Sequence, residues 1–535
     1  MKLRRLEISE FKNLRNFVIE FEQTLTTVLL GQNGTGKSNL LEALILIFRG
    51  LDLGETPEFK YRLDYECRGN EIHIDADKTR SRSKREQVHI RVKHLFSDIE
   101  ENIPYTSQFY EDSERRYLPS YLFGYYSGPS NRMEKHFDKH QDRFYRALLR
   151  GEERPLRPLL YARPVHSQFA LLSLFTEEEE EPTDNGQSVR EFLDDLLGIQ
   201  DLVSVLFVMR QPRQAWNKNF GEARFWHARG AVRDLLTYLY DIALAPMRLK
   251  VRISSEFAST TILEHLYLYL RGIEDLKKLA GHYENRQEFF KALESTYLSK
   301  ILSEVRIRLQ RRNADGSLTF RDLSEGEQQL LMVLGLLRFT KEDEALFLLD
   351  EPDTHLNPAW SVQYLEFMRR VVGEQDTSHV IMCTHNPLVI AGLERKDVRI
   401  MQRDSASGRI YAEIPRENPK GMGVAGILTS ELFGLRSALD IPTQHLLDEQ
   451  RVLVSKAERT QDEQTRLNEL TNHLDELGFM MSEDDPIYAE FIKRFTARED
   501  PHIRQQVALT REQQEERSRL MDEIIGELIA EGRWG

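Results

Sequence analysis

Eight residues near the start of the chain have the types and spacing of a phosphate-binding loop. The segment Gly31-Gln32-Asn33-Gly34-Thr35-Gly36-Lys37-Ser38 lies between the apolar run TTVLL and the helical pattern SNLLEALILIFRGL, so the local order is strand, loop, helix. Glycines let backbone amides turn onto a phosphate, and the following helix points its positive end at the same place. Lysine suits β- and γ-phosphate oxygens, and a serine hydroxyl suits Mg²⁺. The context argues against a chance glycine-rich turn and predicts a Walker A loop.

Two carboxylates stand at the end of a second apolar run, ALFLL, as Asp350 and Glu351. A buried strand does not tolerate unpaired carboxylates, so a metal ion and a polarised water are their natural partners. We therefore predict that Asp350 holds the Mg²⁺ shell and that Glu351 acts as the general base on an attacking water. Acids follow strands often, so this pattern alone is weak.

A third segment, Leu323-Ser324-Glu325-Gly326-Glu327-Gln328-Gln329, has Ser324 and Glu327 at the spacing of a capping box. It predicts a helix that starts here with exposed amides. A well-capped helix is a sufficient explanation for the segment taken alone. Its position, some 20 residues before the two acids, adds the interpretation of a nucleotide-binding signature.

Together these segments resemble the ABC-type ATPases of the SMC and RecF kind. LSEGEQQ resembles their signature, DEPDTHLNP (350–358) their Walker B and D-loop, Thr384-His385 their switch histidine, and LEISEFKNLRNF their first strand. The resemblance implies ATP and Mg²⁺ as cofactors, a catalytic role for Lys37, Glu351 and His385, and closure of two heads around ATP. The signature of one head, with Ser324, Gly326 and Glu327, would cap the γ-phosphate held by the other.

The resemblance also assigns the remaining nucleotide contacts. Asp353 would communicate across the interface of two heads, His385 would contact the γ-phosphate, and Lys12 and Asn13 would lie beside the α-phosphate and adenine. The residues expected to bind nucleotide are Lys12, Asn13, Gly31, Asn33, Gly34, Thr35, Gly36, Lys37, Ser38, Asn39, Ser324, Gly326, Glu327 and Asp353. Those expected at the metal are Ser38, Asp350 and Gln168.

Gln168, in YARPVHSQFALLSLF, fits the place of the Q-loop glutamine, after a strand and at the start of an insertion. An ordinary capping or surface glutamine is an equal alternative. His166 and His355 could suggest a further metal site, but lone histidines are more often hydrogen-bonded structural residues. We assign neither a metal role.

Composition limits the classes of function. The chain has 535 residues, 30% of them charged, and no stretch of about 18 apolar residues that would span a bilayer. The start MKLRRLEISEF lacks a signal core, and two cysteines do not make a disulfide framework, so we expect a cytoplasmic protein. A net charge of −14 argues against a protein that coats nucleic acid by bulk electrostatic attraction. The basic stretch at 78–93 is either a solvated hairpin tip or a local contact with DNA or RNA.

Four segments are predicted: an ATPase lobe with the Walker A loop at 1–165, a helical insertion at 166–300, a second ATPase lobe at 301–430, and a helical region at 431–535. Strands alternate with helices in both lobes, which indicates an α/β class with a mixed central sheet. Leu467, Leu470, Leu474 and Leu477 follow a heptad spacing that suits a helical hairpin or a docking face.

The segments YLFGYYSGPSNRM, RPVHSQFALLSLF and GMGVAGILTSELFGL resemble the ATPases of Septu antiphage operons, also found with retrons. That family pairs with a separate HNH nuclease, so the resemblance implies a slow ATPase that gates a partner and has no nuclease activity of its own. We also expect a homodimer or higher homo-oligomer. Two alternatives are a RecF-like repair ATPase that binds duplex DNA, and an ATP-locked scaffold that turns over slowly or not at all.

Overall fold

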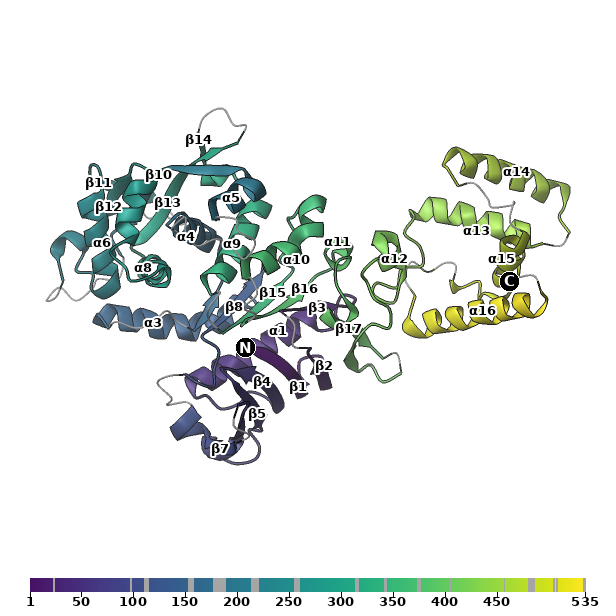
Figure 1. The fold of residues 1–535 in the computed structure, drawn as a ribbon, viewed down its shortest axis with the longest axis horizontal. Coiled ribbons are helices and arrows are strands. Elements are labelled where there is room, and N and C mark those ends of the chain that lie inside the picture. Colours follow the sequence, from purple (N-terminus) through teal and green to yellow (C-terminus); the bar gives the residue numbers. More distant parts are fainter. Residues whose placement is uncertain are drawn as a thin grey trace. The chain divides into compact units, whose positions relative to one another are not determined.

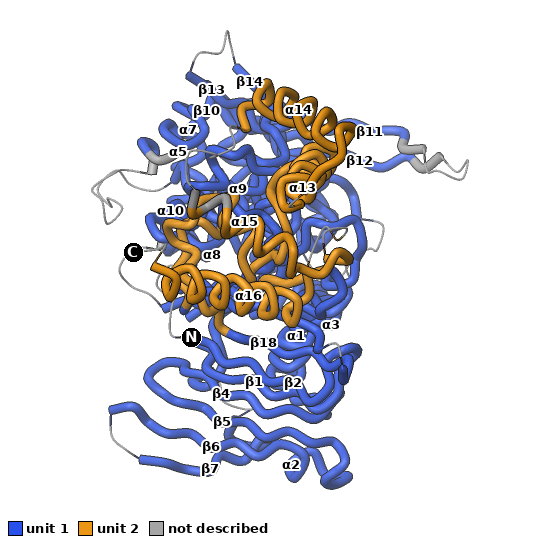
Figure 2. Tube along the Cα trace, turned by 90° about the vertical axis from the view of Figure 1, so that its right-hand side faces the viewer, with its two compact units in different colours: residues 1–29, 33–389, 396–413 blue, residues 30–32, 390–395, 414–535 orange. Residues whose placement is uncertain are grey.

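The computed structural model describes most of the 535 residues. The described ranges are 1–22, 25–96, 99–109, 115–152, 158–176, 189–212, 221–254, 260–312, 317–340, 344–372, 377–404, 406–456, 458–479, 486–503, 506 and 509–532. The chain forms two compact units, shown in two colours in Figure 2. Unit 1 comprises residues 1–29, 33–389 and 396–413, and unit 2 comprises 30–32, 390–395 and 414–535.

A seven-stranded sheet forms the centre of unit 1 (Figure 1), in the order β18-β17-β3-β16-β15-β8-β9. Its strands are β3 (Thr26–Leu30), β8 (Tyr121–Tyr126), β9 (Leu159–Tyr161), β15 (Ala345–Asp350), β16 (His379–Cys383), β17 (Val398–Arg403) and β18 (Ile410–Glu413). The five strands from β3 to β9 run parallel, and β17 pairs with β18 in an antiparallel register. The predicted mixed sheet is therefore confirmed. Carboxyl ends of parallel strands meet at one edge, so Asp350 at the end of β15 and Glu351 just after it lie beside the end of β16.

A second sheet, fully antiparallel, has the order β2-β1-β4-β5-β6-β7. Its strands are β1 (Lys2–Phe11), β2 (Leu14–Glu20), β4 (Tyr61–Cys67), β5 (Asn70–Ala76), β6 (Val88–His94) and β7 (Glu100–Pro104). Helix α1 (Lys37–Leu53) starts at the phosphate loop and packs with both sheets in one hydrophobic core. Because it is covered on both sides, α1 is apolar around most of its surface, as in SNLLEALILIF.

Residues 166–300 contain helices, as predicted, and also strands that the sequence did not predict. The helices are α4 (Pro164–Phe175), α5 (Val189–Leu197), α6 (Gly230–Ile242), α7 (Ile273–Ala280) and α8 (Arg286–Leu298). Strands β10 (Ile199–Arg210), β11 (Met247–Ser254) and β12 (Thr260–Leu270) join β13 (Leu302–Arg311) and β14 (Ser317–Thr319) in a third sheet, β11-β12-β10-β13-β14.

The helical prediction was wrong for 199–210 and 260–270. These strands are buried on parts of both faces, so apolar residues fall at three- and four-residue intervals that imitate a helix. Their β-branched and aromatic residues, as in LVSVLFVM and YLYL, favour strand.

The remaining helices of unit 1 lie between its strands in the sequence. They are α2 (Lys84–Gln87), α3 (Asp138–Arg150), α9 (Glu325–Phe339), α10 (Pro358–Val372) and α11 (Pro387–Ile390). Helix α9 packs on α4 and α10, and its Phe339 contacts Tyr121 of β8, with ring centroids 6.0 Å apart. The signature helix is thereby fixed to the strand next to β15.

Unit 2 is helical in its described residues, as predicted for 431–535. It contains α12 (Gly423–Thr429), α13 (Ile441–Ser455), α14 (Gln461–Glu476), α15 (Pro486–Arg498) and α16 (Arg511–Ala530). Leu467 and Leu470 of α14 pack against Leu453 of α13, so the predicted leucine spacing builds a helical hairpin. Leu477 lies just beyond α14 and is 49% exposed. Among the described helices, none is long and apolar enough to cross a membrane. The four-segment division of the sequence stays a prediction.

Candidate nucleotide-binding site

The phosphate loop takes the backbone shape that its glycines permit. Gly34 and Gly36 have φ angles of 83° and 91°, in the region that other residues rarely adopt. A Cβ on Gly36 would lie 2.9 Å from Leu14 Cδ2 and 3.0 Å from Asn13 Oδ1. The loop is therefore held by close contact with the β1–β2 turn, and Gly36 has both a conformational and a steric reason to be glycine.

Lys37, the first residue of α1, is only 7% exposed. Burial lowers the pKa of its ammonium, and the nearby Cys383, Asp350 and Glu351 act in the opposite direction. Lys37 therefore lies near the acids that follow β15. The structure brings together the first and second predicted motifs, which are more than 300 residues apart in the sequence.

Asp350 is the residue most suited to hold a metal ion. It is 3% exposed, and its Oδ2 atom has no hydrogen-bond partner among the described residues. Burial raises the pKa of this carboxyl, and hydrogen bonds with Ser38 and Cys383 oppose the shift. A buried carboxylate oxygen beside a serine hydroxyl is the oxygen donor set that Mg²⁺ prefers. The donors present therefore fit Mg²⁺, with Ser38 and Asp350 as its ligands.

Glu351 occupies a strained turn immediately after β15. Its φ angle is 55°, in the left-handed region, and its amide donates a 2.9 Å hydrogen bond to the Cys383 carbonyl oxygen. Such strain in a non-glycine residue costs on the order of 1–3 kcal/mol and is common at functional sites. The turn leaves the Glu351 side chain 42% exposed, where a water molecule can reach it.

His385 lies across from Glu351, at the end of β16. Its Nε2 atom is 3.9 Å from Glu351 Oε1. Burial and the positive charge of Lys37 lower the pKa of His385, so the imidazole is neutral near pH 7. A neutral histidine beside a carboxylate can donate one hydrogen bond to a phosphate oxygen or to water.

The signature turn forms the capping box that the sequence predicts. Ser324 Oγ accepts from the Glu327 amide at 3.2 Å, and Glu327 Oε2 accepts from the Ser324 amide at 2.6 Å. Arg311 holds the other oxygen of the Glu327 carboxylate at 2.5 Å. Ser324 and Glu325 are exposed, while Gly326 and Glu327 are buried. The turn is thus rigid and presents its serine to the surface.

The signature helix is in close contact with the D-loop of the same chain. A Cβ on Gly326 would lie 2.4 Å from the carbonyl oxygen of His355, and His355 Nδ1 is 3.4 Å from Glu325 Oε2. His355 therefore has a structural partner. Gly326 is required for this approach because backbone atoms cannot move aside as a flexible side chain can.

Asp353 is buried in the D-loop and accepts a hydrogen bond from Thr384, the residue before the switch histidine His385. Thr384 Oγ1 donates to Asp353 Oδ2 at 2.6 Å. Burial raises the pKa of Asp353 to about 6, and the Thr384 hydrogen bond partly opposes this. The D-loop and the residue before His385 are thereby linked within one chain.

A polar network that the sequence did not reveal lies at the start of α1. Asn13 donates to the Gly34 carbonyl oxygen at 2.9 Å, and Asn39 donates to Asn13 Oδ1 at 2.6 Å. Arg132 donates to Asn39 Oδ1 at 2.8 Å, and its charge also acts on Asp350. The predicted residues Asn13 and Asn39 are thus brought to the loop.

Glu42 is the buried acid of this network. It contacts Lys12, and its Oε1 lies 2.6 Å from His136 Nε2. Burial would raise the pKa of Glu42, but the hydrogen bonds with His136 and Lys12 outweigh it and lower the pKa to about 2. The Lys12 ammonium donates a hydrogen bond to the charged Glu42 carboxylate, so Lys12 stabilises the phosphate loop from a position beside it. Because the hydrogen-bonded residues come from three separate segments, 12–13, 34–42 and 132–136, no local spacing could have indicated them.

Gln168 is not placed with these groups. It is the fifth residue of α4, which follows the edge strand β9, and no polar contact joins it to another described residue. The strand beside β15 is β8, and the residue after it, Ser127, donates its amide to the Asp350 carbonyl oxygen at 3.2 Å. The nearby His166 is bonded to Glu294 at 2.9 Å and to the Arg163 amide at 2.7 Å. The described contacts give no support to a metal role for Gln168.

The basic stretch at 78–93 is partly committed to internal contacts. Lys78 and Lys84 donate to the carbonyl oxygens of Glu58 and Gly54, at 2.7 Å and 2.9 Å. Arg80 pairs with Asp75 at 2.9 Å, and Arg91 with Glu100 at 3.0 Å. These contacts favour the hairpin-tip interpretation over a nucleic-acid surface.

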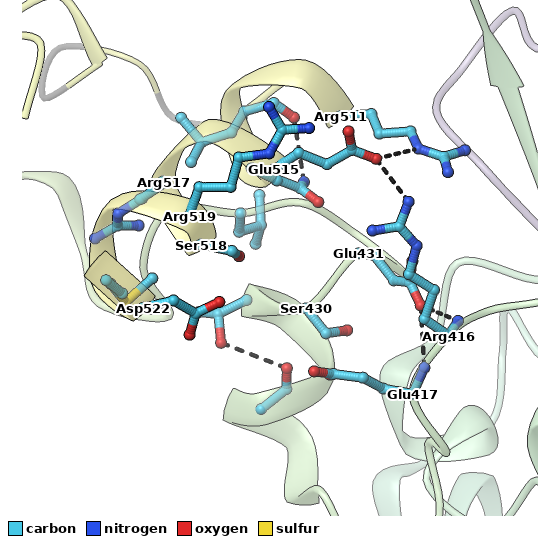
Figure 3. A pocket seen from close by; sticks show the side chains of 16 residues that line it. Arg416, Glu417, Ser430, Glu431, Arg511, Glu515, Arg517, Ser518, Arg519 and Asp522 are labelled. Atoms are coloured by element: carbon cyan, nitrogen blue, oxygen red, sulfur yellow. Dashed lines mark hydrogen bonds and ion pairs between the residues drawn. The ribbon is translucent and has the colours of Figure 1, made fainter. Parts of the chain in front are cut away.

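A hollow in unit 2 is separate from this chemistry (Figure 3). Arg416 and Arg511 both pair with Glu515, at 2.7 Å and 3.1 Å. Its charged lining residues are Arg416, Arg511, Arg517 and Arg519 with Glu417, Glu431, Glu515 and Asp522. Four cations and four anions leave it without the excess positive charge that a triphosphate would need.

Two family models match separate parts of the chain. Residues 1–186 match the AAA ATPase domain, and residues 220–391 match an AAA domain described for the AbiEii toxin of a type IV toxin–antitoxin system. The chain resembles the ABC-type ATPases. The match over residues 1–186 contains the phosphate loop. The match over residues 220–391 contains the signature, Asp350, Glu351 and His385.

A curated relative points in the same direction. The Septu protein PtuA of Bacillus mycoides is 27% identical over 207 residues, a match that covers 36% of this chain and 28% of that protein. The chain thus matches less than a third of the length of this relative. The expected resemblance of this ATPase-like chain to Septu is confirmed.

The chain is partly similar to two solved structures. One is the SMC head domain from Thermotoga maritima, with 14% sequence identity and a TM-score of 0.30. The match covers 78% of this chain and 100% of that domain. Another is the recombination mediator RecF with ATP, with 15% identity and a TM-score of 0.24, over 72% of this chain and 92% of that one. Scores this low do not establish a shared fold, so the assignment rests on the motifs and their geometry.

Proposed function

We propose that the chain binds ATP with Mg²⁺ and hydrolyses it at the edge of the central sheet. The observation that carries the proposal is the buried Asp350 Oδ2 atom. This atom has no hydrogen-bond partner in the part of the chain that the structure describes, and its carboxylate is hydrogen-bonded with Ser38. Burying a carboxylate oxygen that has no hydrogen-bond partner is energetically unfavourable unless a cation binds to it. A bound Mg²⁺ would neutralise phosphate charge here.

The residues of the chain then have distinct roles. Lys37 and the amides of the phosphate loop hold the β- and γ-phosphates, while Glu351 orients a water and accepts its proton. His385, neutral and 3.9 Å from Glu351, donates to the γ-phosphate or to that water. The chemistry is mainly positional, so a rigid strained turn at Glu351 is useful to it.

The site is proposed to be completed by a second head. Within one chain, the polar contacts of Ser324 stay in its own turn, and its side chain is exposed. Amides at a helix start attract anions, so this turn would cap a γ-phosphate brought by another copy. ATP would therefore join two heads, and hydrolysis would release them. The D-loop, packed on the signature through Gly326, would lie at the same interface.

The biological role is proposed from the Septu resemblance. A chain of this kind would serve in bacterial antiphage defence and would regulate a separate effector, of which an HNH nuclease is the expected type. The described residues of unit 2 offer helices for binding such a partner or for self-association. Co-expression with the adjacent reading frame, followed by purification of a stable complex, tests this role. A lone chain that protects against phage without any partner would contradict it.

The catalytic assignment is tested by comparing wild type with Glu351→Gln. We expect hydrolysis to fall about 10²- to 10⁴-fold, the range for loss of a general base, while ATP binding is retained. Glu366→Gln is the matched control, because it makes the same chemical change at an exposed carboxylate of α10 that has no role in the proposed site. Equal hydrolysis by wild type and Glu351→Gln would remove Glu351 from the mechanism.

A further inference from the structure

Strand β11 of the third sheet is a long edge strand with an open side. It pairs with β12 alone among the described strands, in an antiparallel register that joins Leu249 with His265 and Lys250 with Glu264. The β11–β12 hairpin projects from the body of unit 1 (Figure 2). An open edge presents a row of backbone donors and acceptors to another strand.

The two faces of β11 differ in chemistry. Met247 and Leu249 lie on one face and are 51% and 46% exposed. Arg248, Lys250 and Arg252 lie on the other face, since side chains alternate along a strand. Arg248 is engaged by Glu264 and the Arg224 carbonyl oxygen, but no ion pair of the described residues involves Lys250 or Arg252.

We propose that this edge binds an extended segment of a partner protein in which acidic and apolar residues alternate. The partner strand would continue the sheet beyond β11, with its acidic side chains opposite Lys250 and Arg252 and its apolar side chains beside Met247 and Leu249. Backbone hydrogen bonds would provide affinity, and the alternating side chains would provide specificity.

A second copy of β11 fits this edge poorly. In an antiparallel pair of two β11 strands, directly opposed residues share a face. A register that centres Lys250 on Lys250 opposes cations to cations, and a shift by one residue opposes cations to apolar side chains. Nucleic acid fits less well too, because a phosphate backbone would cover the cations and leave Met247 and Leu249 exposed.

The test uses the full chain and two labelled eight-residue peptides, one alternating glutamate with valine and one alternating lysine with valine. Fluorescence anisotropy should show saturable binding of the acidic peptide only. Lys250→Glu with Arg252→Glu should weaken that binding at least about tenfold, as expected for two reversed cross-strand charge pairs. The matched control is Arg306→Glu with Arg308→Glu, which reverses two positive charges at the same spacing on the interior strand β13. It should bind like wild type.

Four outcomes would overturn the proposal. They are no binding of the acidic peptide, equal binding of the basic peptide, unchanged binding by the β11 variant, and loss of binding by the β13 variant. Concentration-dependent self-association abolished by the β11 variant would instead assign the edge to a second copy, and duplex DNA binding abolished by it would assign the edge to nucleic acid. The proposal does not depend on ATP hydrolysis, so its failure leaves the catalytic assignment intact.

Discussion

Asp350, Glu351 and Asp353 show how one short segment gives carboxylates different environments. Asp350 is buried, and one of its oxygens has no hydrogen-bond partner within the described ranges. Glu351 is half-exposed on a strained turn, and Asp353 is buried and accepts a hydrogen bond from the Thr384 hydroxyl. The environment of Asp350 suits binding of a cation, and that of Glu351 suits contact with a water molecule. The environment of Asp353 suits a structural hydrogen bond. Burial and backbone direction therefore give these three carboxylates different roles, which the sequence DEPD alone does not distinguish.

Asp353 should make the stability of the head depend on pH. Its pKa is raised from 3.8 to about 6 by burial, so the folded state binds the proton more tightly than the unfolded state. The stabilisation is full below pH 3.8 and is lost as pH rises to about 6. Asp353→Asn stays neutral, so it should exceed wild type in unfolding free energy by up to about 3 kcal/mol at neutral pH.

Urea unfolding of both proteins, near pH 4 and near pH 7, measures this difference. Near pH 4 the two should be similar, because the wild-type carboxyl is then largely protonated in the folded state. If the unfolding free energy of the variant equalled that of wild type at both pH values, Asp353 would not be the source of the pH dependence.

At the scale of elements, the signature helix approaches the D-loop so closely that Gly326 has no room for a side chain. Gly326→Ala would place a Cβ 2.4 Å from the His355 carbonyl oxygen, so the D-loop must shift. We expect a loss of about 1–3 kcal/mol in unfolding free energy, the usual cost of overpacking, together with slower ATP hydrolysis.

Gly50→Ala is the control for that change, because a Cβ on Gly50 of α1 meets no atom within 4 Å. It should stabilise the helix slightly, by up to about 1 kcal/mol, since alanine has the higher helix propensity. Thermal unfolding and turnover of both variants give the comparison. If Gly326→Ala were as stable and active as Gly50→Ala, the close approach would have no role.

The elements also show what the sequence could predict. The phosphate loop, the Asp350 strand and the Ser324 cap were recognisable because each is contiguous, with its chemistry and its secondary structure in one short segment. The network of Glu42, Arg132 and His136 was not recognisable, since its members meet only in the folded chain. The sequence predicts helix rather than strand at 199–210 and 260–270, because burial on both faces removes the two-residue alternation of a strand.

For the whole molecule, the central claim is that two heads share each nucleotide site. The exposed Ser324 turn and the buried Lys37 belong to one chain, yet they are proposed to serve different ATP molecules. A mixture of two inactive variants tests this arrangement directly. Lys37→Ala removes the phosphate lysine, and Ser324→Arg obstructs the signature, so each should be inactive alone.

In a mixed dimer of the two variants, one site carries both changes and the other carries neither. An equal mixture should therefore recover about a quarter of the wild-type hydrolysis, because half of the dimers are mixed and each has one intact site. The measurement is steady-state phosphate release by the mixture, compared with each variant alone. Restoration to that level is the predicted result, and a rate no greater than the sum of the two variants would contradict the shared site.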